Sequence, residues 1–159
     1  MTVLILGACA SYDGRGLVPG SSTQVEVEAL MGLPAARRAT PDGGSVLYFP
    51  RGPQGRHSYA ASMGADGVLR SLDQLLTLEN INALVSGSTT RAEVRDRFGP
   101  PGPISRFPLS EREVWEYKWQ YYNEMRVLWV HFSGDGILRE VINMRDFSAE
   151  PPGGRRGRR

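Results

Sequence analysis

The chain has 159 residues, of which 40% are hydrophobic and 23% are charged, and its formal net charge is +2. This composition is typical of a globular protein, and no stretch approaches the roughly 20 apolar residues of a membrane-spanning helix. Because Arg155–Arg159 carries four positive charges, residues 1–154 sum to 2 − 4 = −2, which excludes a basic nucleic-acid-binding body.

The chain begins with an apolar run, MTVLILGAC, that ends in its single cysteine, Cys9. Leu6–Cys9 resembles a bacterial lipobox, in which a signal peptide is cut before a cysteine that then receives lipid. On this interpretation residues 1–8 are a signal remnant, Cys9 is lipidated and residues 9–16 form a tether. The alternative is a plain structural N-terminus, because the apolar run is only about six residues long and no basic residue precedes it.

The sequence next shows an internal repeat. Gly20–Pro34 and Gly87–Pro101 align without a gap at an offset of 87 − 20 = 67 residues, with seven identities in fifteen positions. Average residue usage gives about one such match by chance. Asp66–Arg70 and Asp135–Arg139 repeat in the same way at an offset of 69. These two pairs of similar segments predict a tandem duplication.

Each repeat opens with a sequence typical of a short capped helix. Thr23 and Thr90 are predicted N-caps, and Glu26 and Glu93, three residues later, complete a capping box with them. The capping role accounts for both carboxylates, so we do not interpret them as an acid/base pair.

A glycine followed two residues later by a proline predicts the end of each helix. Gly32 and Gly99 are expected to adopt a left-handed conformation, since glycine meets no steric penalty there.

A further helix is predicted at the start of the second repeat, where residues 75–85 carry apolar side chains at helical spacing.

Alternation of apolar and polar residues predicts three strands in each repeat. In the second repeat they are Val114–Tyr121, Arg126–Ser133 and Ile137–Met144, and in the first Val46–Phe49, Ser58–Met63 and Val68–Leu72. The predicted fold class is therefore α+β, with two tandem repeats that each pack a short helix or helices on a three-stranded antiparallel meander. Repeat 1, the more degenerate copy, spans residues 17–75, repeat 2 spans 76–147, and residues 148–159 form a disordered basic tail.

The second repeat combines several short motifs in a fixed order: Gly-(polar)-Thr-x-x-Glu-Val, Gly-x-Pro, Trp-x-Tyr, a strand ending in Phe, and an Asp-Gly turn. This combination resembles the SmpA/OmlA (BamE-like) family. The residues that match these motifs are Gly87, Thr90, Glu93, Val94, Phe98, Gly99, Pro101, Trp115, Tyr117, Phe132, Asp135 and Gly136. The family is the small accessory lipoprotein of the outer-membrane β-barrel assembly machine. The resemblance implies helices on a three-stranded sheet, an acyl anchor in the periplasmic face of the outer membrane, and non-catalytic contact with envelope proteins, including β-barrel assembly components.

The doubled unit is similar in architecture to a second class, the secreted β-lactamase inhibitor proteins, which grip a hydrolase with an aromatic sheet. Two functions therefore stay open at this point. One is a lipid-anchored adaptor or scaffold, and the other is a tandem-repeat inhibitor that binds a soluble hydrolase.

No residue pattern indicates an enzyme, a cofactor or a metal site. His57 and His131 lack a cysteine partner and the His–Glu spacing of a metal site. The best binding candidates are Trp129, Tyr122 and His131, which are predicted on the sheet face opposite the core. Exposed aromatic residues of this kind mark contact sites. The alternative is that the first repeat or the tail covers this face.

Overall fold

The computed structural model describes residues 13–51 and 56–149. The predicted signal remnant, Cys9 and the arginines of the tail lie outside the described residues. In chain order the elements are α1 (Gln24–Met31), β1 (Ala36–Ala39), β2 (Ser45–Pro50), β3 (Ser58–Met63), β4 (Leu69–Gln74), α2 (Leu78–Asn82), α3 (Arg91–Phe98), β5 (Ile104–Phe107), the 3-10 turn η1 (Pro108–Ser110), β6 (Arg112–Tyr121), β7 (Glu124–Ser133), β8 (Leu138–Arg145) and the 3-10 turn η2 (Phe147–Ala149).

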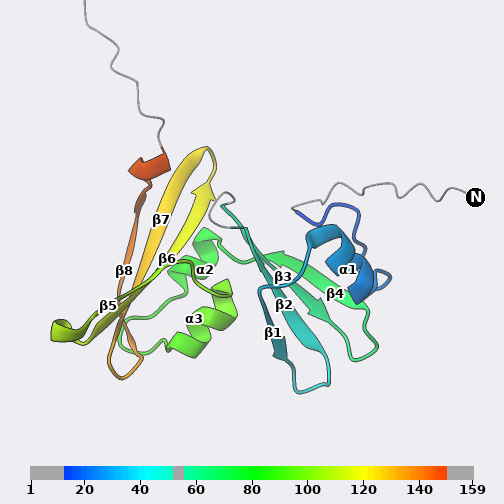
Figure 1. The fold of residues 1–159 in the computed structure, drawn as a ribbon, viewed down its shortest axis with the longest axis horizontal. Coiled ribbons are helices and arrows are strands. Elements are labelled where there is room, and N and C mark those ends of the chain that lie inside the picture. Colours follow the sequence, from blue (N-terminus) through cyan, green and yellow to red (C-terminus); the bar gives the residue numbers. More distant parts are fainter. Residues whose placement is uncertain (1–12, 52–55, 150–159) are drawn as a thin grey trace, which may run out of the picture.

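The protein is α+β, with two antiparallel four-stranded sheets in which neighbours in sequence are neighbours in space. Sheet 1 is β1-β2-β3-β4 and sheet 2 is β5-β6-β7-β8. We call α1 with sheet 1 unit 1, and α2 and α3 with sheet 2 unit 2. Figure 1 shows four successive layers, namely α1, sheet 1, the helices α2 and α3, and sheet 2.

Each unit has its own apolar core between its helix and one face of its sheet. In unit 1, Val27 and Met31 of α1 pack on the inner face of sheet 1. In unit 2, Val94 and Phe98 of α3 pack on the inner face of sheet 2, where Trp115 meets Phe132 edge-on at 4.9 Å between ring centroids. Two turns of isolated helix are marginal in water, so this burial is what holds α1 and α3.

The sheets have four strands each, so the predicted three-stranded meander is incomplete. The additional strands, β1 and β5, stand at the sheet edges and pair with β2 and β6. Their sequences, ARRA and ISRF, bury no residue, and backbone pairing alone defines them. The helix predicted over 75–85 is also shorter than expected, because α2 covers only Leu78–Asn82.

Both predicted capping boxes are present and have the same geometry. The backbone N–H of Thr23 donates to Glu26 Oε2 at 2.7 Å, and that of Thr90 donates to Glu93 Oε2 at 2.7 Å. The Glu26 and Glu93 carboxylates have pKa values below the ordinary range, chiefly because of these backbone hydrogen bonds. Each N-cap also forms a β-bridge to the residue just before the last strand of its own unit, Thr23 to Val68 and Thr90 to Ile137, which fixes the helix to its sheet.

The glycines that end α1 and α3 differ from the left-handed residues expected. Gly32 has φ +84° and ψ −176°, and Gly99 has φ +78° and ψ −171°. This combination of positive φ with extended ψ is open essentially only to glycine. The chain therefore leaves each helix fully extended.

The outer face of sheet 1 packs on the C-terminal end of α3. The buried Ser58 hydroxyl donates to the carbonyl of Phe98 at 2.9 Å, and the Tyr48 hydroxyl donates to the carbonyl of Asp96 at 3.4 Å. Arg38 adds an exposed ion pair with the Asp96 carboxylate at 3.0 Å. The carbonyls at a helix end have no partner within the helix, so unit 1 satisfies groups that unit 2 leaves open.

A matched pair of glycine variants tests how tightly the units pack. An alanine at either Gly32 or Gly99 meets the same backbone penalty, about 1–3 kcal/mol. Only at Gly99 does the new Cβ also lie 3.1 Å from Tyr48 Cδ1 and 3.2 Å from Ser58 Oγ, whereas at Gly32 it meets nothing within 4 Å. We expect Gly99→Ala to lower the free energy of unfolding by about 1 kcal/mol more than Gly32→Ala, measured by urea denaturation. Equal losses would show that the interface tolerates an added methyl group.

Candidate functional site

The outer face of sheet 2 has no covering layer in the described part of the chain. Each sheet packs its inner face on the helix or helices of its own unit, and its outer face points away from them. The outer face of sheet 1 is covered by α3 of unit 2. Apart from the 3-10 turn η2, whose Ser148 contacts Lys118 at one end, Figure 1 shows no helix or strand over the corresponding face of sheet 2. A two-layer unit normally buries only one sheet face, so this surface is available for contact.

Strand alternation and register define the residues of this face, because side chains at successive positions point to opposite sides of a sheet. Trp115, Tyr117 and Trp119 of β6 point to the core. The outer face therefore consists of Val114, Glu116, Lys118 and Gln120 of β6, Val127, Trp129 and His131 of β7, and Glu140, Ile142 and Met144 of β8. Apolar side chains occupy its centre and charged ones its margins.

Trp129 lies at the centre of this face and is half-buried. It stands opposite Glu116 on β6 and Ile142 on β8. Its indole Nε1 donates to Glu116 Oε2 at 2.9 Å, which restrains the ring. A restrained aromatic side chain loses little conformational entropy when a partner binds, and such residues often dominate binding energy.

Unit 1 has a small residue where unit 2 has this tryptophan. A β-bulge marks the same place in both sheets, between Ser62 and Met63 in β3 and between His131 and Phe132 in β7. Counting back from the bulge places Ala60 at the position of Trp129. The small, buried Ala60 suits a face packed against the rest of the chain.

His131 lies on the same face as Trp129, opposite Val114 and Glu140. Its Nε2 atom is buried and has no hydrogen-bond partner among the described residues. Tyr122 lies apart from both, in the turn that joins β6 to β7. The structure thus brings together two of the three predicted contact residues and places the third at the hairpin tip.

Tyr122 is strained as well as exposed. It has φ +48° and is 82% exposed, and its ring meets that of Tyr121 edge-on at 4.7 Å between centroids. A positive φ is a genuine outlier for a bulky side chain and costs roughly 1–2 kcal/mol. The two-residue turn between Tyr121 and Glu124 requires a positive φ, which glycine adopts without strain and tyrosine does not.

A buried ion cluster at the rim ties the two units together. Asp146, which follows β8, accepts hydrogen bonds at Oδ2 from Lys118 Nζ at 2.8 Å and from Arg56 Nη1 at 2.7 Å. Arg56 belongs to unit 1, so this contact spans both units. Burial raises the pKa of the Asp146 carboxyl, but the hydrogen bonds from Lys118, Ser148 and Arg56 outweigh it and leave the pKa well below the ordinary range. No sequence pattern pointed to this cluster, because its members come from three distant segments.

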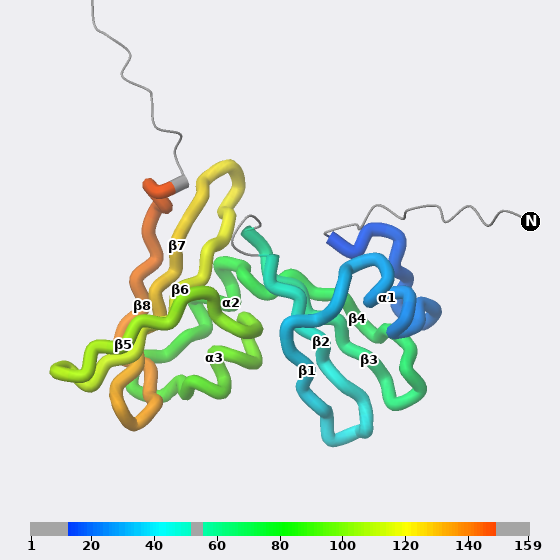
Figure 2. The backbone as a smooth tube through the Cα atoms, in the orientation of Figure 1, coloured from blue at the N-terminus to red at the C-terminus, as the bar shows by residue number. Residues whose placement is uncertain are grey.

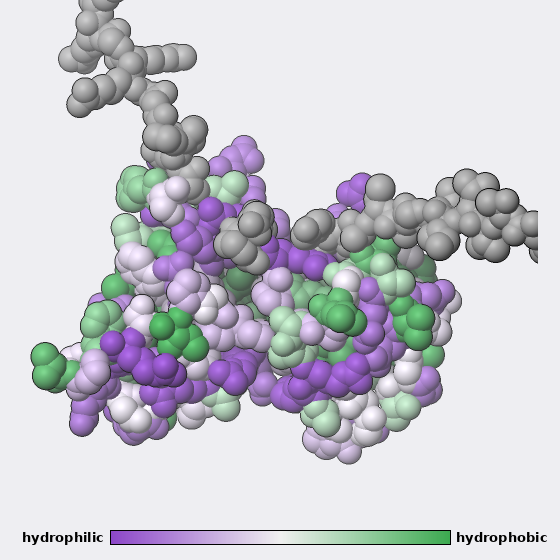
Figure 3. Space-filling model, viewed as in Figure 1, coloured by the Kyte–Doolittle hydropathy of each residue, from purple (hydrophilic) through white to green (hydrophobic). Residues whose placement is uncertain are grey.

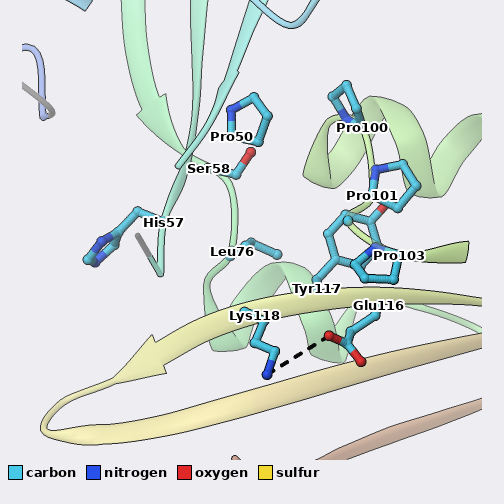
Figure 4. A pocket seen from close by; sticks show the side chains of 11 residues that line it. Pro50, His57, Ser58, Leu76, Pro100, Pro101, Pro103, Glu116, Tyr117 and Lys118 are labelled. Carbon is cyan, nitrogen blue, oxygen red and sulfur yellow. Dashed lines mark ion pairs between the residues drawn. The ribbon is translucent and has the colours of Figure 1, made fainter. Parts of the chain in front are cut away.

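A cleft of about 460 Å³ opens beside β6, where the two units meet. It is lined by Pro50, His57, Ser58, Leu76, Pro100, Pro101, Gly102, Pro103, Glu116, Tyr117 and Lys118. Figure 4 shows Pro50 and Ser58 facing the prolines after α3, with Leu76 and Tyr117 between them and the Glu116–Lys118 pair at one side. His57, for which no metal-binding role is predicted, stacks on Tyr59 with 5.9 Å between the ring centroids.

The hairpin between β5 and β6 carries a separate apolar tip. Phe107 and Leu109 are largely exposed there. Figure 3 shows hydrophobic residues at the end of this projecting hairpin, apart from the hydrophilic surface of the body. The counterpart in unit 1, the turn between β1 and β2, is polar and glycine-rich.

Within residues 13–51 and 56–149, no group of three His, Cys, Asp or Glu side chains is arranged to hold a metal ion. In the same residues, no helix has the length and apolar character needed to cross a membrane.

Comparisons with known proteins identify no family for this chain. No family model matches the sequence, and no curated protein matches it. Among solved structures, a DUF4309 family protein (YjgB) from Bacillus subtilis is similar over 83% of this chain and 84% of its own, with 17% sequence identity and a TM-score of 0.32. A similarity of this degree supports no statement about fold or function.

Replacing Tyr122 at the hairpin turn with glycine distinguishes its effect on stability from its effect on partner binding. Tyr122→Gly removes the strain of a positive φ, and we expect the melting temperature to rise by about 2–4 °C. If Tyr122 serves partner contact, the same variant should bind its partner more weakly. The control is Tyr121→Ala, at a neighbouring residue whose φ is not positive, which should not gain stability. A lower melting temperature for Tyr122→Gly would show that the Tyr121–Tyr122 ring contact outweighs the strain.

Proposed function

We propose that this chain is a non-catalytic, lipid-anchored periplasmic adaptor of the bacterial outer membrane, related to the SmpA/OmlA lipoproteins. Cys9 carries the acyl anchor, and the outer face of sheet 2 binds an envelope protein such as a β-barrel assembly component. The observation that carries the binding part of the proposal is the face around Trp129, over which the described residues place no layer (Figure 1). The anchor and the location derive from the sequence resemblance alone.

The proposal includes a tandem duplication as the origin of the two units. Equivalent hydrogen bonds support it, since Gly20 N–H donates to Leu69 O at 2.7 Å and Gly87 N–H donates to Leu138 O at 2.8 Å. Each unit also has the same order of capped helix and four-stranded meander. The repeated capping boxes and the repeated bulge are further support.

The contacts that stack unit 1 on unit 2 have no counterparts at the free face. The position of Tyr48 is taken by Glu116 in sheet 2, and the position of Asp96 is taken by Ala29 in α1. A second copy therefore cannot repeat the same packing on sheet 2. This argues for a different protein as the occupant of that face, which is what an adaptor requires.

The binding face is tested by truncating its central side chain. We expect Trp129→Ala to reduce capture of envelope proteins from detergent-solubilised membranes at least about tenfold, because a central aromatic anchor contributes more than about 2 kcal/mol. Phe107→Ala, which removes an exposed aromatic residue from the β5–β6 hairpin, serves as the matched control and should bind like the parent.

The identity of the captured protein separates the two functions. Barrel-assembly components, recovered by the parent and lost with Trp129→Ala, support the adaptor. Stoichiometric recovery of one soluble hydrolase would support the tandem-repeat inhibitor instead. A large loss of melting temperature in Trp129→Ala would show that this residue is structural.

The anchor is tested separately by labelling with a radioactive fatty acid. The parent chain should incorporate label and sediment with membranes, whereas Cys9→Ser should do neither, because a diacyl anchor holds a protein stably on a bilayer and its loss releases it. Ser11→Ala, close to the same site, is the control and should keep the label. Equal labelling of parent and Cys9→Ser would contradict lipidation at Cys9.

A further inference from the structure

Strand β6 is much longer than its neighbour β5, so part of its edge is left without a partner strand. β5 pairs only with the first four residues of β6, from Arg112 to Trp115. The segment before β5 adds two hydrogen bonds, in which Gly102 N–H donates to Glu116 O at 2.9 Å and Glu116 N–H donates to Pro103 O at 3.0 Å. In Figure 2 the β6–β7 hairpin continues beyond β5.

Beyond this point the edge presents free backbone groups. Alternate residues of a strand direct their N–H and C=O groups to the same side, so Lys118 and Gln120 follow Glu116 and face away from β7. In the described part of the chain, no backbone or side-chain group pairs with these N–H and C=O groups. Unpaired strand edges are a template for another strand, and proteins usually protect them.

Unit 1 shows such protection at the equivalent position. The pairing of Pro50 with Ser58 corresponds to that of Lys118 with Val127. Proline has no N–H group, so sheet 1 offers no donor where sheet 2 offers one. Of these two equivalent edges, only that of unit 2 has a complete set of backbone donors and acceptors.

The open edge borders the cleft between the units. Figure 4 shows Lys118 and Tyr117 of β6 beside this cleft, with Pro50, Leu76 and Pro101 around it. These walls accept an apolar side chain from a strand laid along β6. The cleft is continuous with the packed interface of the two units, because Ser58 contributes to both.

The charged groups at this edge balance one another, so only the residue type at the edge position bears on the occupant. Lys118 and Arg56 both contact the carboxylate of Asp146, and Lys118 also pairs with Glu116, so the four groups sum to 1 + 1 − 1 − 1 = 0. Glu116 lies nearer the Pro103 end of the edge, 4.0 Å from Lys118 Nζ. An acidic side chain directly across from Lys118 is favoured, since opposite charges on paired strands attract.

We propose that the edge of β6 from Lys118 to Tyr121 binds an extended polypeptide segment by strand addition. The segment places an apolar side chain in the cleft and an acidic side chain across from Lys118. Peptides recognised in this way gain affinity from backbone hydrogen bonds and specificity from alternate side chains. The inference rests on the proposed function as a binding protein and names the chemistry of a partner segment beside the Trp129 face.

The probe is a synthetic peptide, acetyl-Ser-Val-Glu-Val-Ser-amide, titrated into 15N-labelled protein. We expect saturable shifts of the Lys118 and Gln120 amide signals and slower hydrogen exchange of both amides. A peptide of the same side chains with N-methylated backbone should bind at least about tenfold more weakly, because it cannot donate to the edge. Replacing its glutamate with glutamine should weaken binding by a smaller factor.

Two protein variants distinguish the contribution of the Gln120 backbone to peptide binding from that of its side chain. Gln120→Pro removes the edge N–H, which an edge strand tolerates, and should weaken binding at least about tenfold. Gln120→Ala keeps the N–H and should bind like the parent. Equal binding of the N-methylated peptide, or no saturable shift at millimolar peptide, overturns the proposal. Trp129→Ala should leave peptide binding unchanged, so a failure at the Trp129 face and a failure at this edge are distinguishable.

Discussion

The arrangement of the whole molecule depends on how the outer face of sheet 1 meets the end of α3. The buried Ser58 hydroxyl satisfies the Phe98 carbonyl, and Gly99 lets Tyr48 and Ser58 approach the helix end closely. Burial of a helix terminus requires such a partner for its free carbonyls. Because unit 1 packs on the helices of unit 2, both faces of sheet 1 are covered, whereas among residues 13–51 and 56–149 only the inner face of sheet 2 has a covering layer (Figure 1).

The two sheets differ in ways that match this difference in environment. Where sheet 1 is packed against unit 2, its outer face carries the small Ala60 and the hydroxyl groups of Tyr48 and Ser58. At the equivalent place sheet 2 carries Trp129, restrained by Glu116. The same architecture thus yields an intramolecular interface in unit 1 and a surface suited to a partner in unit 2.

The region around β6 concentrates the features that stability alone does not explain. Tyr122 holds a bulky side chain at positive φ, and the β6 edge beyond β5 has backbone groups with no partner among the described residues. Strain and open edges both cost free energy and are usually removed from a fold unless a function retains them. Their proximity to the cleft and to Trp129 is consistent with a binding surface assembled along one hairpin.

Much of the local structure could be predicted from the pattern of residues. The Thr–Glu spacing marked both capped helices, and period-2 alternation marked the inner and outer faces of β6 and β7, including the outward position of Trp129. These features depend on neighbours in sequence and so leave a local pattern. The folded chain was needed to reveal the short strands β1 and β5, the stacking of the units, the Asp146 cluster and the open β6 edge. Each of these depends on groups brought together from distant segments, through backbone pairing or buried contacts that no local pattern encodes.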